Sequence, residues 1–132
     1  MDRRPLVAAG AAAVLSGIPS TAYALATGRS VWEATRAAGT LLLDDDEAPA
    51  ALAIAGLASH AVISLGWGVV LFRVLPTRRP RGWGVLAGLG IAALDLGVIG
   101  RRFSRIAALP TIPQLADHAA FGFVVAHVRH RV

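Results

Sequence analysis

Four apolar stretches alternate with short polar or charged connections, and this alternation is the dominant pattern along the chain. The apolar stretches cover about residues 6–27, 50–75, 83–100 and 106–128. Each is close to the roughly 20 residues that an α-helix needs to cross the hydrocarbon core of a bilayer. The pattern predicts an all-α, polytopic membrane four-helix bundle, with residues 1–132 forming a single membrane domain.

The connection between the first two stretches is the longest, and it carries a helix signal of its own. Ser30-Val31-Trp32-Glu33 has the form of a capping box, in which the Ser and Glu side chains satisfy the first free backbone donors of a helix. We therefore expect an interfacial helix over about residues 31–43 in the first outer loop, with Trp32 at the headgroup level. The acidic run at residues 44–47 lacks the alternating ligands and glycine turn of a calcium loop, which favours a solvated linker.

The first apolar stretch imitates a secretory signal peptide, because two arginines precede it and Ala22-Tyr23-Ala24 resembles a cleavage site. Pro19 lies in the middle of the stretch, with Ser16 and Ser20 one turn apart beside it. This arrangement is typical of a kinked spanning helix, since neighbouring groups in a bundle can satisfy the backbone that a proline frees. We expect a retained, kinked helix.

The charged residues indicate which partners the protein can bind and how it is oriented in the membrane. Hydrophobic residues make up 55% of the chain and charged residues 16%, with a net charge of +5 that comes from arginines near the helix ends. No basic stripe with interleaved aromatic residues is present, so we expect a lipid bilayer with anionic headgroups as the partner and no nucleic acid. With a cytoplasmic N-terminus, eight of the 13 arginines fall in inner segments and five in outer ones. The positive-inside rule then predicts a multi-pass protein of the cell membrane with N and C termini cytoplasmic.

Polar stripes recur at helical spacing inside the apolar stretches, where ionisable side chains are costly and mark functional or packing sites. The three stripes are Gly56, His60 and Ser64; Gln114, His118 and Gly122; and Gly84, Gly88 and Asp95. Gly84 and Gly88 form a GxxxG pair, which lets two helices approach closely. Because Asp95 shares their face, we expect it to point at a neighbouring helix.

These stripes predict one polar layer, in the outer half of the bundle, that binds a ligand or handles protons. Its candidate residues are Ser16, Ser20, Tyr23, His60, Ser64, Asp95, Gln114 and His118. Asp117 is assigned instead to the first turn of the last helix, where the helix dipole favours a carboxylate.

Three functions compete for this layer. The first is transport of a small solute, an ion or protons, because a buried Asp and His can exchange protons. The second is a structural or accessory membrane subunit without chemistry, whose polar residues only form hydrogen bonds between helices. Such a subunit could act alone, as a homo-oligomer or with a membrane partner protein. The third is a redox protein in which His60 and His118 ligate haem b; the other two readings need no cofactor.

Other chemistry is largely excluded by the composition. The chain has no cysteine, so disulfides and thiolate metal sites are ruled out. It contains no HExxH, GxSxG, Walker or dinucleotide-binding motif, and no enzymatic activity is predicted.

Five segments carry a resemblance that extends over nearly the whole chain: Ser16–Thr21, Arg36–Thr40, Ala93–Asp95, Gly100–Arg102 and Pro113–His118. Through them the chain resembles a family of small four-helix integral membrane proteins of high-GC bacteria. The resemblance implies the four-helix architecture and attaches no activity to it.

Overall fold

A computed structural model describes residues 2–131 of the chain, and 79% of the protein is helical, with no strand among the described residues. The helices are α1 (Arg4–Leu15), α2 (Ile18–Thr27), α3 (Glu33–Gly39), α4 (Pro49–Val74), α5 (Pro80–Leu94), α6 (Ser104–Ala107) and α7 (Thr111–Arg131). A π-helical turn, η1 (Asp95–Ile99), and a 3₁₀ turn, η2 (Gly100–Arg102), extend α5.

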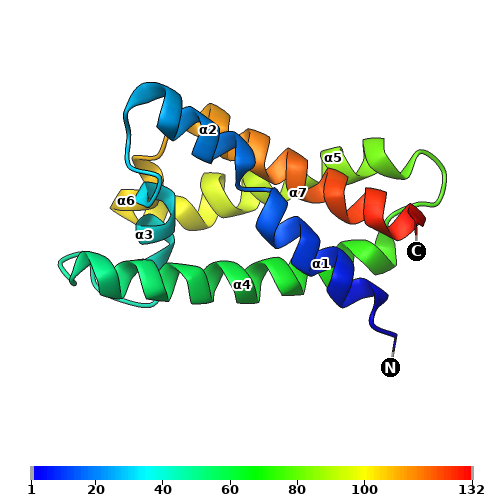
Figure 1. The fold of residues 1–132 in the computed structure, drawn as a ribbon, viewed down its shortest axis with the longest axis horizontal. Coiled ribbons are helices and arrows are strands. Elements are labelled where there is room, and N and C mark those ends of the chain that lie inside the picture. The colour runs from blue at the N-terminus through cyan, green and yellow to red at the C-terminus, as the bar shows by residue number, and fades with distance from the viewer. Residues whose placement is uncertain (1, 132) are drawn as a thin grey trace.

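The α1–α2 pair, α4, α5 with η1, and α7 lie alongside one another, with the N and C ends of the chain at the same end of the molecule (Figure 1). Helices α3 and α6 lie together at the opposite end, which we call the α3/α6 end. Helix α5 packs mainly on α7, and α1 packs on both α4 and α7. Helix α3 packs along α4.

Three helical segments are long and apolar enough to cross a membrane: Arg4–Thr27, Pro49–Val74 and Pro80–Arg102. Large apolar side chains on them face outward; Val14, Ile54 and Val62 are at least 70% exposed. A surface of this kind is disfavoured in water and suited to lipid, so these segments associate the protein with a membrane. Helix α7 does not meet the same criterion, since it carries an aspartate, three histidines and two arginines.

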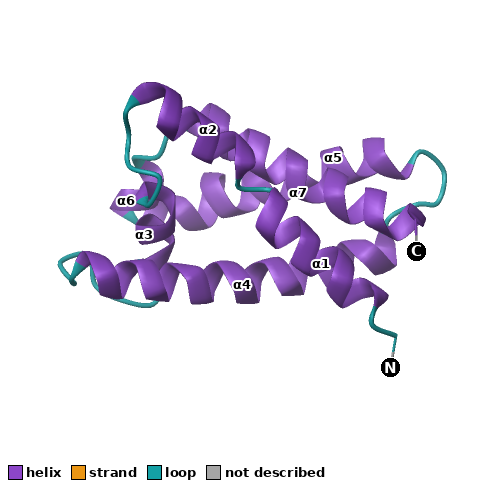
Figure 2. Cartoon of the chain, viewed as in Figure 1, coloured by secondary structure: helices purple, strands orange, loops and turns teal. Residues whose placement is uncertain are grey.

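The first predicted span is interrupted, as Pro19 led us to expect. Helix α1 ends at Leu15 and α2 begins at Ile18, so Ser16 and Gly17 form a two-residue break, drawn in teal between the two helices in Figure 2. Pro19 occupies the first turn of α2, where its missing N–H is tolerated. The break leaves carbonyls at the end of α1 and N–H groups at the start of α2 without partners in their own helix.

Helix α3 is shorter than the predicted interfacial helix over residues 31–43, and the capping box is not formed. The Ser30 hydroxyl accepts the N–H of Trp32, and Glu33 bonds to the Arg29 guanidinium through both carboxylate oxygens (2.9 and 2.6 Å). A bidentate charged pair is stronger than the single bond by which Glu33 would cap the backbone, which explains the difference.

The last predicted helix, about residues 106–128, is two elements. Helix α6 ends at Ala107, Pro110 lies in the connection, and α7 begins at Thr111. Asp117 therefore lies six residues after the first residue of α7, beyond its first turn. The prediction that the helix dipole accounts for Asp117 was wrong, because the dipole effect falls off within one turn.

Glycines set the closest helix contacts. A Cβ added to Gly84 would collide with the carbonyl of Gly122, and one added to Gly88 would collide with the carbonyl of His118. These pairs show that α5 and α7 run antiparallel with their backbones in contact. The GxxxG prediction for this helix is therefore confirmed.

The apolar core occupies the half of the molecule near the chain ends. It consists of Ala8, Ala12, Leu71, Leu75, Ile91, Phe121, Val125 and Ala126. Arg129 of α7 closes this half by donating to the carbonyl of Leu75, just past the end of α4, while its guanidinium lies 5.9 Å from the ring of Phe72.

At the α3/α6 end, an ion pair ties the acidic linker to α6. Arg105 donates to the carboxylate and to the backbone carbonyl of Asp45, and the Ser104 hydroxyl donates to the same carboxylate (3.2 Å). The bond from Arg105 holds the pKa of Asp45 below its ordinary value. The linker, predicted to be solvated throughout, is therefore anchored at one of its four acids.

Replacing Gly88 with alanine should destabilise the protein by about 1–3 kcal/mol, because the new methyl group must push α5 away from α7. Gly90→Ala is the matched control, since a Cβ there meets nothing within 4 Å. Thermal unfolding in detergent, followed by circular dichroism, compares the two variants. Equal melting temperatures would contradict the close contact.

Acidification should release the linker from α6. Since the pKa of Asp45 is lower in the folded than in the unfolded chain, the contact is fully present above the unfolded value of about 3.9 and is lost as pH falls through the folded pKa. Amide hydrogen exchange at residues 44–48 and 104–108 should rise in that range. Asp45→Asn should show fast exchange at every pH, and a wild-type protein with no pH response would contradict the assignment.

Candidate functional site

Asp95 and His118 are the two ionisable side chains that the structure brings together inside the helices. Asp95 Oδ2 lies 3.5 Å from His118 Nε2, and both side chains are largely buried, with 26% and 21% exposed. They meet because every helical Cβ leans toward the N-terminus of its own helix. In the antiparallel α5–α7 pair, Asp95 and His118 therefore lean toward each other.

The hydrogen bond of the other ring nitrogen of His118, Nδ1, determines which nitrogen can exchange a proton. Nδ1 lies 2.8 Å from the backbone carbonyl of Gln114, and a carbonyl can only accept, so Nδ1 carries a hydrogen. Nε2, which faces Asp95, is then the nitrogen that gains or loses a proton. The pair can hold that proton on either residue, as a neutral acid beside a neutral imidazole or as an ion pair.

Asp95 also begins the π-helical turn η1. The N–H of Gly100 bonds to the Asp95 carbonyl, five residues back rather than four. Such turns are rare and occur frequently at functional sites. Gly100 in turn approaches α6 so closely that a Cβ would clash with the Ile106 side chain.

Asp117 has a partner that the sequence did not suggest. Its Oδ1 accepts the backbone N–H of Ser20 (2.9 Å), and Ser20 lies in the first turn of α2. Asp117 thus caps α2 from another helix, replacing the capping side chain that α2 lacks. The signal that could have found it is the break beside Pro19, which requires an acceptor from elsewhere.

His60 satisfies the other side of the same break. Its Nε2 lies 2.8 Å from the carbonyl of Ala13, in the last turn of α1, and must donate to it. Among the described residues, no hydrogen bond or ion pair joins His60 to Asp95 or His118, and His60 is exposed at the surface of α4. The break therefore explains His60 as a donor to a free backbone carbonyl.

Among the described residues, the other members of the predicted layer form no side-chain hydrogen bond with the pair. Gln114 contributes its backbone carbonyl, and Tyr23 is 39% exposed. Ser16 and Ser64 are buried, with 4% and 6% exposed. The hydroxyl of Ser20 donates to the carbonyl of Gly17 across the break.

Asp95 and His118 come from different depths of the α5–α7 pair. His118 lies level with Gly88, because a Cβ at Gly88 would collide with the His118 carbonyl. Asp95 lies seven residues beyond Gly88, about 10 Å closer to the α3/α6 end. The two side chains lean toward each other along the helix axes and so span this offset.

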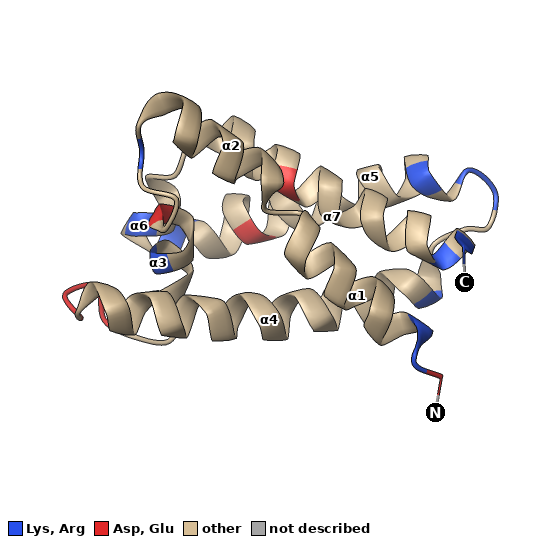
Figure 3. Ribbon diagram, viewed as in Figure 1, with Lys and Arg blue, Asp and Glu red and all other residues tan. Residues whose placement is uncertain are grey.

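Charges elsewhere lie at the two ends of the molecule. Figure 3 shows arginines clustered at both ends and two acidic positions between them, on the α5–η1 segment and on α7, which carry Asp95 and Asp117. No arginine lies within the helices at that level. Within the part of the chain that the structure describes, the partner of the Asp95 carboxylate is His118 and that of the Asp117 carboxylate is the N–H of Ser20.

Haem or metal ligation would require existing contacts to break. Both nitrogens of His118 face oxygen atoms, and the Nε2 of His60 is bonded to Ala13. Among the described residues, no group of three His, Asp or Glu side chains is placed to hold a metal ion.

Comparisons with protein-family models, curated proteins and solved structures found no match for this chain. The function must therefore be inferred from the site itself.

Asp117→Ala should lower the stability by about 1–3 kcal/mol, because it leaves the partly buried N–H of Ser20 without an acceptor. Asp117→Asn should retain most of the stability, since its amide oxygen can still accept. Thermal unfolding in detergent measures both, with Asp46→Ala in the exposed linker as the control. If the alanine and asparagine variants unfold at the same temperature as the wild type, Asp117 does not cap α2.

Proposed function

We propose that the protein is a small multi-pass membrane protein that binds and passes protons at the Asp95–His118 pair. The observation that carries this proposal is the pair itself, with Nε2 and Oδ2 3.5 Å apart. His60 and Asp117 are accounted for by the break in the first span, whereas Asp95 satisfies no backbone group. A carboxylate inside a membrane bundle is costly, so its presence without a structural task favours a functional one.

The chemistry follows from the pinned hydrogen on Nδ1 of His118. A proton that reaches the pair binds at Nε2 or at Oδ2 and leaves from the same two atoms, while the rest of the ring stays fixed by Gln114. The 3.5 Å separation is longer than an ordinary hydrogen bond, so no short bond locks the proton between the two side chains. Protons are the first candidate cargo; a co-transported solute would use the same pair.

The topology proposed with this function has α7 as a fourth span, completing a four-helix bundle with N and C termini cytoplasmic. Three candidate spans would leave the two chain ends on opposite sides, whereas both ends lie together in Figure 1. The polar residues of α7 that lower its hydropathy, Asp117 and His118, face α2 and η1 rather than lipid. The α3/α6 end is then the outer one, and α3 lies at the interface.

A structural subunit without chemistry is the second candidate, because the contacts of His60 and Asp117 alone hold the broken span in one arrangement. Interhelical hydrogen bonds in membranes contribute roughly 0.6–2 kcal/mol each, which is enough to select one packing. In that case the protein would assemble with further copies of itself or with another membrane protein, and a pull-down in mild detergent would recover that partner.

Proton flux into proteoliposomes, driven by a potassium diffusion potential and reported by an enclosed pH dye, tests the proposal. Asp95→Asn and His118→Gln should reduce the flux to that of empty liposomes, since neither replacement can hold a proton. Asp46→Asn, the same chemical change in the exposed linker, should leave the flux unchanged. Gel filtration and circular dichroism verify that each variant is folded.

Two results would overturn the proposal. One is a wild-type protein that carries no protons above empty liposomes, and the other is an Asp95→Asn variant that retains full flux. If both variants unfold, infrared difference spectroscopy of the wild type during a pH change replaces them, and the absence of a carboxylic acid band then favours the structural subunit.

A further inference from the structure

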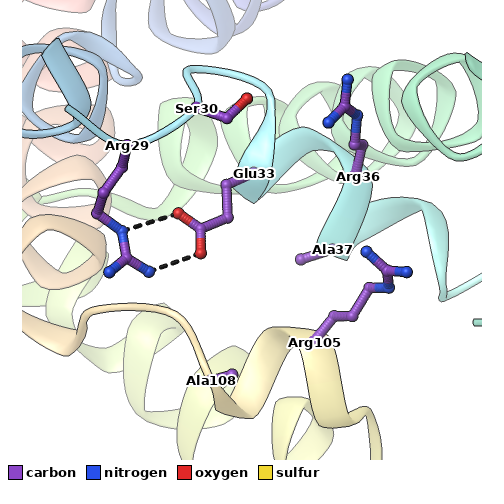
Figure 4. A pocket seen from close by; sticks show the side chains of 7 residues that line it. All are labelled: Arg29, Ser30, Glu33, Arg36, Ala37, Arg105 and Ala108. Atoms are coloured by element: carbon purple, nitrogen blue, oxygen red, sulfur yellow. Dashed lines mark hydrogen bonds and ion pairs between the residues drawn. The ribbon is translucent and has the colours of Figure 1, made fainter. Parts of the chain in front are cut away.

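A cavity of about 410 Å³ opens at the α3/α6 end, outside the three candidate spans. Its walls come from the segment after α2, from α3 and from α6. The lining residues are Arg29, Ser30, Glu33, Arg36, Ala37, Arg105 and Ala108. Figure 4 shows Arg29 with Glu33 on one side of this space and Arg105 on the other, with Ala37 on α3 and Ala108 on the segment that follows α6.

Positive charge exceeds negative charge around the cavity. The guanidinium of Arg29 is bonded to Glu33, and that of Arg105 to Asp45. Arg36 is the third guanidinium, and within the described chain its buried Nε has no hydrogen-bond partner. In Figure 4 the guanidinium of Arg36 points away from those of Arg29 and Arg105, so the side chain of Arg36 would have to rotate to bring its guanidinium into the cavity.

A buried donor without an acceptor costs about 1–3 kcal/mol, and more when the group is charged. An anion with several oxygens would supply the missing acceptors to Arg36 and to the free donors of Arg29 and Arg105. Phosphate matches guanidinium groups in geometry, because two parallel N–H groups bind two of its oxygens. The Ser30 hydroxyl, which accepts from Trp32, still has its hydrogen to donate.

We propose that this cavity binds a phosphate group, either free or as part of an anionic lipid headgroup. The cavity lies at the ends of the spans, which is the level of the lipid phosphates. Trp32, a residue type enriched at that level, immediately precedes α3 and is 46% exposed. Ala37 and Ala108, from two walls of the cavity, give it an apolar part that suits the ester side of a headgroup. The site is independent of the Asp95–His118 pair.

Purified protein in neutral detergent is titrated with phosphatidylglycerol, with phosphatidylcholine and with inorganic phosphate, and the melting temperature is followed. A rise with phosphatidylglycerol alone identifies a lipid headgroup as the ligand, whereas a rise with inorganic phosphate identifies free phosphate. Either supports the proposal. No rise with any of the three, or an equal rise with phosphatidylcholine, overturns it.

Arg36→Gln is the variant of choice, because it removes a guanidinium for which the structure shows no internal ion pair. It should weaken the apparent affinity about tenfold, the equivalent of 1.4 kcal/mol. Arg78→Gln makes the same charge change in the loop between α4 and α5, at the opposite end of the molecule, and should bind as the wild type does. Equal weakening by both would show a general charge effect and overturn the site.

Arg36→Lys keeps the inference testable if Arg36→Gln does not fold. Lysine preserves the charge but cannot form two parallel bonds, so binding should fall between that of the wild type and that of a variant without the charge. Unchanged binding in the lysine variant would show that Arg36 does not hold the anion through its fork of donors.

Discussion

A spanning helix that breaks inside a membrane must find partners for its freed backbone groups within the protein, because no water is present to supply them. Much of the interior polar chemistry of this chain follows from that constraint at Ser16 and Gly17. The end of α1 offers a carbonyl, and His60 donates to it; the start of α2 offers an N–H, and Asp117 accepts it. Two ionisable residues that resemble a functional site are thereby tied to the backbone, and they join α4 and α7 to the first span.

The contact between α5 and α7 has a different basis, since it depends on the absence of side chains. Gly84, Gly88 and Gly122 let the two backbones touch, and this short separation brings Asp95 within reach of His118. Larger residues at the glycines would hold the carboxylate and the imidazole apart without changing either. The geometry of the pair therefore depends on residues that carry no functional group, among them Gly88, which lies two turns before Asp95 and against the backbone of His118.

The sequence predicts those parts of the fold that depend on local pattern. The kink beside Pro19 and the direction of Asp95 follow from the position of a proline and from the spacing of small residues, and the structure agrees with both. The partners of Asp117 and Arg129 could not be assigned in this way, because the N–H of Ser20 and the carbonyl of Leu75 are backbone groups that lie far away in the chain; the break beside Pro19 indicates only that some acceptor is needed. The prediction of a capping box was wrong for a related reason. The motif considers only residues 30–33, whereas the carboxylate of Glu33 binds Arg29, which lies outside the motif.

The π turn at Asp95–Ile99 changes the phase of the helix that contains it. One extra residue in a turn displaces everything beyond it by about 100° around the helix axis relative to an uninterrupted α-helix. Gly100, the residue just after this turn, packs on Ile106 of α6. The carboxylate stands at the residue where the phase changes, so an insertion or deletion in this turn would redirect everything that follows Asp95 while leaving α5 before it in place.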